Sequence, residues 1–166
     1  MTDSRGDQGD RVAELIAVWQ RELPEVLHPT SELSKRLMVL ADALHQAGRP
    51  VLRELGLTSA EFDVIVALRR AGAPYRQKPS DLSRSLFLSS GGTTNVVNQL
   101  VRRGLVAREP DPDDGRGIQI LLTNEGVAAA EEAVTASSAA HHKVWDGVPD
   151  ETVERATAAL RALLRG

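Results

Sequence analysis

The chain has 166 residues, of which 42% are hydrophobic and 3% aromatic, so it suits one domain whose core is built from aliphatic side chains on packed helices. It contains no cysteine, which excludes disulfide bonds, thiolate metal ligands and cysteine-based redox switches. The formal net charge is −3, and neither a signal sequence nor a run of about 18 apolar residues occurs. We therefore expect a cytoplasmic protein without a membrane segment.

The first part of the chain predicts two amphipathic helices. Between Val12 and Leu23, apolar residues fall at positions i, i+3, i+4, i+7 and i+11, which is one stripe on a helix. Between Leu33 and Leu44, leucines recur at spacings of 4, 3 and 4, which is typical of a seam that packs on another helix. Pro50 predicts a kink or a break further along the second helix.

The middle of the chain predicts a helix-turn-helix. Thr58 and Glu61 have the spacing of a capping box at a helix start, and Pro79 suits the first turn of the next helix. Ser89 is expected to cap a further helix, which ends at Gly104. This last helix is the candidate for reading DNA in the major groove.

The outer face of that helix carries small polar side chains around a basic end. Such side chains read base edges without holding the helix away from the groove. The expected DNA-binding residues on it are Ser89, Ser90, Thr94, Asn95, Asn98 and Arg102. Gly91 and Gly92 disfavour a helix, so they indicate either a close backbone approach to DNA or a slack surface turn.

Two strands at Leu105–Arg108 and Ile118–Leu122 predict a β-hairpin wing. Arg116 lies between two glycines at the expected tip, so it is expected to extend into a groove of the DNA. The neighbouring aspartates would be repelled by phosphate, and therefore either turn away or hold Arg116 in place. We expect the second of these two arrangements.

Positive charge is concentrated between Arg76 and Arg108, where six basic residues face only Asp81. This balance is typical of a surface that meets phosphate, although a solvated basic surface has the same signature. After the wing, Thr123 with Glu125 predicts the start of an Ala-rich helix, and an amphipathic helix follows it. These two helices, within residues 123–166, are expected to complete a dimer. We expect a disordered tail at 1–10, dimerisation helices at 11–56, a winged helix-turn-helix at 57–122 and C-terminal dimerisation helices at 123–166.

The segments LSSGGTTNVVNQLVRRGLV, DPDDGRGIQILLT and LTNEG together resemble the MarR family of winged-helix transcription regulators, over about residues 33–164. The resemblance implies a mainly α fold with a small β wing, and a homodimer formed by the N- and C-terminal helices. It also implies binding to a pseudo-palindromic operator in double-stranded DNA, with Arg116 in the minor groove.

The added first helix is similar to the urate-responsive and PecS-type branch of that family. This likeness implies a ligand site that includes Trp19, Asp63 and Arg108, and His45 is a further candidate. From the residues alone, a core or dimer-packing role is favoured over a ligand-binding one for Trp19. Asp63 is either a partly buried, paired group or a solvated one. The branch carries an arginine where this chain has Val96 and Val97, which argues against urate itself.

The sequence thus predicts a DNA-binding repressor released by a small organic ligand, with no cofactor. The alternative is a metal sensor of the same fold, with His28, His45, His141 or His142 and carboxylates as ligands. No GxSxG, Walker A or GxGxxG run occurs, so no enzymatic activity is expected.

Overall fold

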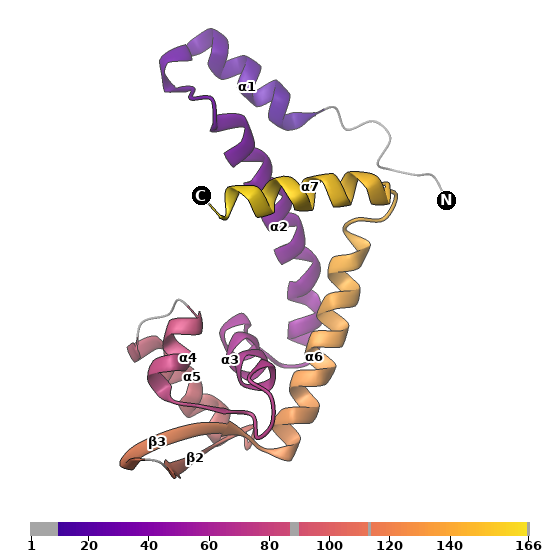
Figure 1. Cartoon of the computed structure of the whole chain (residues 1–166). Coiled ribbons are helices and arrows are strands. Elements are labelled where there is room, and N and C mark those ends of the chain that lie inside the picture. The colour runs from indigo at the N-terminus through magenta and orange to yellow at the C-terminus, as the bar shows by residue number, and fades with distance from the viewer. Residues whose placement is uncertain (1–9, 87–89, 113, 166) are drawn as a thin grey trace. The chain divides into compact units, whose positions relative to one another are not determined.

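The computed structural model describes residues 10–86, 90–112 and 114–165, with the backbone alone at residues 90 and 114–116. Helices dominate it and a small sheet completes it, so the expected mainly α fold with a β wing is confirmed (Figure 1). The chain divides between Gln46 and Ala47 into two compact units, called here the N-terminal and the C-terminal unit. The elements in order are α1 Arg11–Glu22, a 3-10 turn Pro24–Val26, α2 Ser31–Glu54, α3 Ser59–Arg70, β1 Arg76–Gln77, α4 Pro79–Leu86, α5 Ser90–Arg102, β2 Val106–Asp111, β3 Asp114–Leu122, α6 Asn124–Lys143 and α7 Asp150–Leu163.

Hydrogen bonds of Asp10 connect α1 to the first turns of α2 within the N-terminal unit. Its carboxylate caps α1 by accepting from the backbone N–H groups of Val12 and Ala13. The same carboxylate accepts two hydrogen bonds from the Arg36 guanidinium, at 2.6 and 3.1 Å. The Arg36 hydrogen bonds, assisted by the capping bonds, hold the pKa of Asp10 below its ordinary value.

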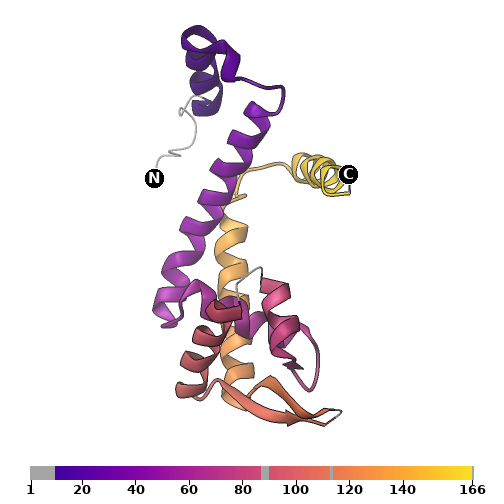
Figure 2. The ribbon, with the colours of Figure 1, turned by 90° about the vertical axis from the view of Figure 1, so that its left-hand side faces the viewer.

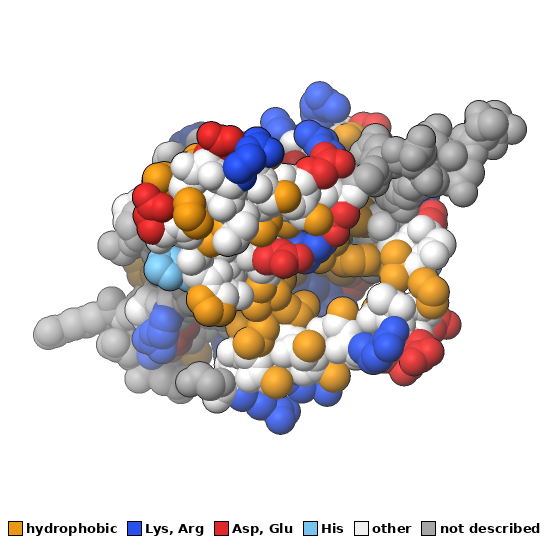
Figure 3. Space-filling model, turned by 90° about the horizontal axis from the view of Figure 1, so that it is seen from above, with side chains coloured by type: hydrophobic (Ala, Val, Ile, Leu, Met, Phe, Trp, Pro, Cys, Tyr) orange, Lys and Arg blue, Asp and Glu red, His pale blue; other side chains and the backbone are white. Residues whose placement is uncertain are grey.

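The apolar stripes of α1 and α2 are largely exposed. Val12 is buried, but Trp19 is 42% exposed and Met38 is 63% exposed. Hydrophobic side chains also stand at the surface of α7, none of whose residues is buried. Figure 3 shows hydrophobic side chains at the surface among charged ones. Large exposed apolar side chains of this kind are typical of surfaces that contact another protein.

Helix α2 continues through Pro50, so a break at this residue, one of the two expected outcomes, is wrong, and a kink stays a prediction. A proline inside a helix removes one backbone hydrogen bond, but the remaining bonds of the helix persist when packing supports them. Gly48, two residues earlier, is buried, and a Cβ atom placed on it would lie 3.1 Å from His141 Nε2 on α6. Close packing at this glycine therefore supports the helix where the proline weakens it.

Helix α3 lies at the centre of the C-terminal unit. Its residues Val64, Ile65 and Leu68 are completely buried, as are Leu82 of α4 and Leu100 of α5. Helix α6 packs along α3, and α4 and α5 pack against its other side (Figure 1). Thr58 and Glu61 form the expected capping box at the start of α3. This core is the base on which α5 and the wing are held.

A three-stranded antiparallel sheet, in the order β1-β3-β2, forms the wing. Its hairpin projects beyond the helices, as Figure 2 shows. The strands β2 and β3 are longer than expected, so Arg116 lies within β3 and the prediction that it occupies a loop tip is wrong. The sequence analysis also missed β1, where Arg76 pairs with Leu121 of β3. Strand β2 extends to Asp111 and β3 begins at Asp114.

The start of α6 is fixed by Thr123, as the LTNEG segment predicts. Its hydroxyl accepts a hydrogen bond from the Gly126 N–H at 3.0 Å and donates one to the Gly104 carbonyl at 2.7 Å. Gly126 itself is buried against the Leu105 carbonyl oxygen, which a Cβ atom would overlap. The connection from α5 to the wing is thereby tied to α6. Within the described ranges, no helix is both long and apolar enough to cross a membrane.

Candidate nucleic-acid interface

Helix α5 buries one face and exposes the other. Val97, Leu100 and Thr93 are buried in the core. Thr94 and Asn95 are exposed on the opposite face. Side chains three and four residues apart share a helix face, so the exposed positions continue one stripe along α5.

The structure brings together most of the predicted DNA-binding residues. Thr94, Asn95 and Arg102 are exposed on α5, and Asn98 is half-buried on the same stripe. Ser89 and the side chains of Ser90 and Arg116 lie outside the described residues. The stripe has the small polar character that lets a helix enter the major groove of B-DNA, which is about 12 Å wide.

Two of the six basic residues between Arg76 and Arg108 are paired with carboxylates from other parts of the chain. Arg103 Nη1 lies 2.9 Å from Glu61 Oε1, and Lys78 Nζ lies 2.8 Å from Asp111 Oδ2. Both carboxylates are buried. The net positive charge available at the surface is therefore smaller than the sequence count suggests, because Lys78 and Arg103 are each paired with a buried carboxylate.

The Asp111 carboxylate at the end of β2 is buried and paired. Its side chain accepts from Gln119 Nε2 at 2.9 Å as well as pairing with Lys78, and the residue is 3% exposed. Lys78 therefore gives the buried Asp111 carboxylate a cation. The Arg116 side chain lies outside the described residues, so the expectation that the wing aspartates hold Arg116 stays a prediction.

Arg108 links the wing to α5. It lies on β2, and its Nη2 donates a hydrogen bond to Asn98 Oδ1 at 2.7 Å. Arg108 was predicted as a ligand-binding residue and Asn98 as a DNA-binding one. The two predicted sites therefore share one direct contact.

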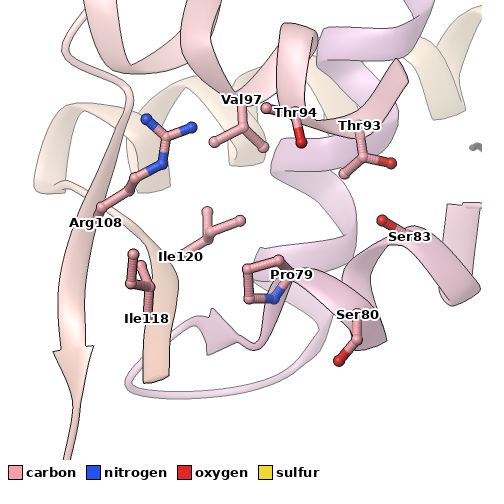
Figure 4. A pocket seen from close by; sticks show the side chains of 9 residues that line it. All are labelled: Pro79, Ser80, Ser83, Thr93, Thr94, Val97, Arg108, Ile118 and Ile120. Carbon is pink, nitrogen blue, oxygen red and sulfur yellow. The ribbon is translucent and has the colours of Figure 1, made fainter. Parts of the chain in front are cut away.

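A pocket of about 560 Å³ opens between α4, α5 and the wing. Figure 4 shows the Arg108 guanidinium at one end of it, and the hydroxyls of Ser83 and Thr93 at the other end. Val97, Ile118 and Pro79 contribute apolar walls. An apolar pocket with a few convergent polar groups is typical of small-molecule sites. One cation and several hydroxyls favour a small organic anion.

The other predicted ligand residues do not line this pocket. Trp19 lines a separate pocket of about 390 Å³ within the N-terminal unit, together with Leu15 and Met38. His45 and Asp63 are exposed, and neither lines either of these two pockets. The ligand-binding role of all four residues stays a prediction.

The described residues provide no group of three or more histidine and carboxylate side chains that could hold a metal ion. The metal-sensing alternative therefore gains no support from them.

The structure also contains contacts that the sequence did not indicate. The Glu61–Arg103 pair joins the start of α3 to the residue after α5, and Gln119 joins β3 to Asp111. The capping-box spacing identified Glu61 as a backbone cap, but no local signal points to a partner 42 positions away. Charged residues at helix ends are the signal that could have raised this possibility.

A buried core under an exposed polar helix, with a β-hairpin beside it, defines a winged helix-turn-helix DNA-binding protein. Comparison with known proteins agrees. The profile of the MarR family matches residues 55–117. The HTH-type transcriptional regulator PecS of Dickeya dadantii is 30% identical over 127 residues, which cover 74% of each chain. The chain belongs to the MarR family, whose relatives found here are DNA-binding transcriptional regulators.

Two solved structures have the same fold. A mutant of Escherichia coli MarR complexed with operator DNA has a TM-score of 0.69 at 23% identity, and covers 89% of this chain and 98% of its own. Bordetella bronchiseptica BpsR, whose DNA binding is regulated by 6-hydroxynicotinic acid, has a TM-score of 0.69 at 22% identity, with coverages of 84% and 98%. The shared fold includes the helices and the wing that form the candidate interface.

Proposed function

We propose that the protein binds a pseudo-palindromic operator as a homodimer and represses transcription until a small organic acid releases it. The observation that carries this proposal is the Arg108–Asn98 hydrogen bond, since it joins the pocket to the exposed stripe of α5. A ligand in the pocket and a base in the major groove would thus act on neighbouring side chains.

The DNA-binding part of the proposal rests on α5 and the wing. Thr94, Asn95 and Arg102 are exposed on one stripe of α5. The short polar side chains of Thr94 and Asn95 suit base edges, and the basic side chain of Arg102 suits phosphates. The fold shared with an operator-bound MarR supports this placement. Arg116, on β3, is the proposed minor-groove contact.

The homodimer is supported by the exposed apolar surface of the terminal helices. Trp19, Met38 and Leu163 are each at least 42% exposed, which is costly for an isolated chain. Pairing with a second copy would cover this surface. A two-fold dimer presents two copies of α5, so its operator would have two half-sites about 34 Å apart or a multiple of this distance.

Release follows if the ligand binds the DNA-free arrangement more tightly than the DNA-bound one. A carboxylate in the pocket would pair with the Arg108 guanidinium, which has five N–H donors and forms bidentate pairs with carboxylates. That pairing competes with the hydrogen bond to Asn98. The regulation of BpsR by an aromatic acid supports this class of ligand for a protein of this fold.

Selection of duplexes from a random pool tests the proposal. We expect an enriched sequence with two-fold symmetry, and release of that duplex by 6-hydroxynicotinate or benzoate at millimolar concentration. The Arg108→Met variant should bind these acids more weakly. Enrichment of no sequence would contradict the DNA-binding proposal, and equal release of the two proteins would contradict the pocket assignment.

A further inference from the structure

The Asn98 side chain is held in one orientation by its partner. A guanidinium carries only hydrogen-bond donors, so the amide atom that faces Arg108 has to be the oxygen. The Nη2–Oδ1 distance of 2.7 Å is that of a strong, charge-assisted hydrogen bond. The Nδ2 group, with its two N–H donors, is the end of the amide left for a further partner.

Arg108 is well placed to hold this orientation, because it extends from a fixed part of the sheet. It lies in β2 opposite Ile120 of β3, and Ile120 is 3% exposed. Val106, two residues earlier on β2, is 2% exposed.

We propose that Arg108 makes Asn98 a donor-only reader of the DNA, so that Asn98 selects guanine and rejects cytosine at one position of each operator half-site. This inference rests on the proposed role of α5 as the recognition helix. It deepens that role, because it gives one residue a base preference that the residue type alone does not have.

The preference follows from the pattern of groups in the major groove. Guanine presents two acceptors, N7 and O6, whereas cytosine presents only the N4 amino donor. A free asparagine pairs with adenine instead, because it offers both a donor and an acceptor to adenine N6 and N7. Occupying Oδ1 with Arg108 removes the acceptor that the adenine pair requires.

Substitutions at Asn98 and Arg108 should reverse or remove the donor-only character of the Asn98 side chain. Asn98→Asp keeps an acceptor for Arg108 but replaces the two donors by an acceptor oxygen, which suits the cytosine N4 amino group. Arg108→Met keeps much of the side-chain length but frees Oδ1, so Asn98 can then pair with adenine. Arg108→Lys retains a donor and is the conservative variant. Asn95→Asp adds the same negative charge to the same helix without an arginine partner, and is the matched control.

The experiment measures base preference rather than affinity alone. Duplexes are selected from a random pool by the full-length wild-type protein, and single-base changes in the selected sequence are compared by fluorescence anisotropy at one fixed salt concentration. We expect one position at which the wild type favours guanine over cytosine by about tenfold, the size of one good base contact. Asn98→Asp should reverse that ratio, and Arg108→Met should move the preference to adenine.

The controls separate this inference from general effects. Asn95→Asp should lower affinity through its charge but leave the guanine position unchanged, and Arg108→Lys should keep the guanine preference. Thermal unfolding followed by circular dichroism checks that each variant is folded. A guanine preference that persists in Arg108→Met, or a position that Asn98→Asp does not alter, would overturn the inference while leaving DNA binding intact. Failure of the wild type to enrich any sequence would overturn both proposals.

Discussion

Arg103 Nη1 donates a hydrogen bond to Glu61 Oε1 at 2.9 Å, and this contact joins the residue after α5 to the start of α3. Glu61 also accepts from the Thr58 backbone N–H at 2.9 Å. Burial alone would raise the pKa of Glu61, but these bonds outweigh it and hold the pKa below its ordinary value. The ionised carboxylate is therefore the form that the fold stabilises.

The first prediction concerns acid stability. Because the pKa of Glu61 in the folded protein is lowered, the stabilisation by its carboxylate is complete above the ordinary value of about 4.5, and is lost as the pH falls through the folded value. Glu61→Gln should cost about 1–2 kcal/mol at pH 7, and less below pH 4. Urea unfolding between pH 3 and 7 measures this. Glu125→Gln, at an exposed position in the first turn of α6, is the control and should change stability far less. A penalty for Glu61→Gln that does not depend on pH would contradict the role of the charge.

The second prediction concerns the close approach at Gly126. A Cβ atom at this position would overlap the Leu105 carbonyl oxygen, which is backbone and cannot move without distorting the link between α5 and the wing. Gly126→Ala should therefore destabilise the fold by about 1–3 kcal/mol or more, in spite of the better helix propensity of alanine. Thermal unfolding provides the measurement, and an unchanged or higher melting temperature would show that the approach is not tight.

Gly91 gives the opposite expectation and so tests the interface. A Cβ atom there meets nothing within 4 Å, and the residue lies in α5. Gly91→Ala should stabilise the fold by up to about 1 kcal/mol, because alanine favours a helix. If the backbone approaches DNA at this position, the same variant should bind the selected operator more weakly. Higher stability without any loss of operator affinity would show that the backbone does not approach DNA closely at this glycine.

The Lys78–Asp111 pair supports the fourth prediction. The Asp111 side chain is 1% exposed, whereas that of Lys78 is 49% exposed. Lys78→Met would leave a buried carboxylate with Gln119 but without this cation, so we expect a loss of about 1–3 kcal/mol. Replacement of the exposed Lys35 by Met is the comparison, and should cost much less. Equal losses in the two variants would mean that the wing does not depend on the pair.

Local signals predicted much of this fold. The capping box at Thr58, the cap at Thr123 and the helix end at Gly104 are set by residues within a few positions of one another, so sequence spacing is sufficient to find them. The family resemblance also predicted the winged helix-turn-helix, which the relatives confirm.

Long-range contacts were beyond such reasoning. The wing strands extend further than expected and β1 was missed, because a two-residue strand has no periodicity and depends on its partner β3. Asp111 lies 33 positions after Lys78, and Arg108 lies ten positions after Asn98, so their pairing depends on how the wing folds against α4 and α5. For the same reason, the sequence placed Arg108 in one ligand site with Trp19, His45 and Asp63, although these three residues do not line the pocket at Arg108.

The central claim, that α5 reads an operator, is tested most directly by one ratio. This ratio compares the affinities for the selected operator and for a scrambled duplex, at the same salt concentration, in the wild type and in the double variant Thr94→Val with Asn95→Ala. Both side chains are exposed, so the fold should remain intact. We predict that the ratio falls at least about tenfold, because base contacts are lost while phosphate contacts persist. An unchanged ratio in the folded double variant would contradict the claim.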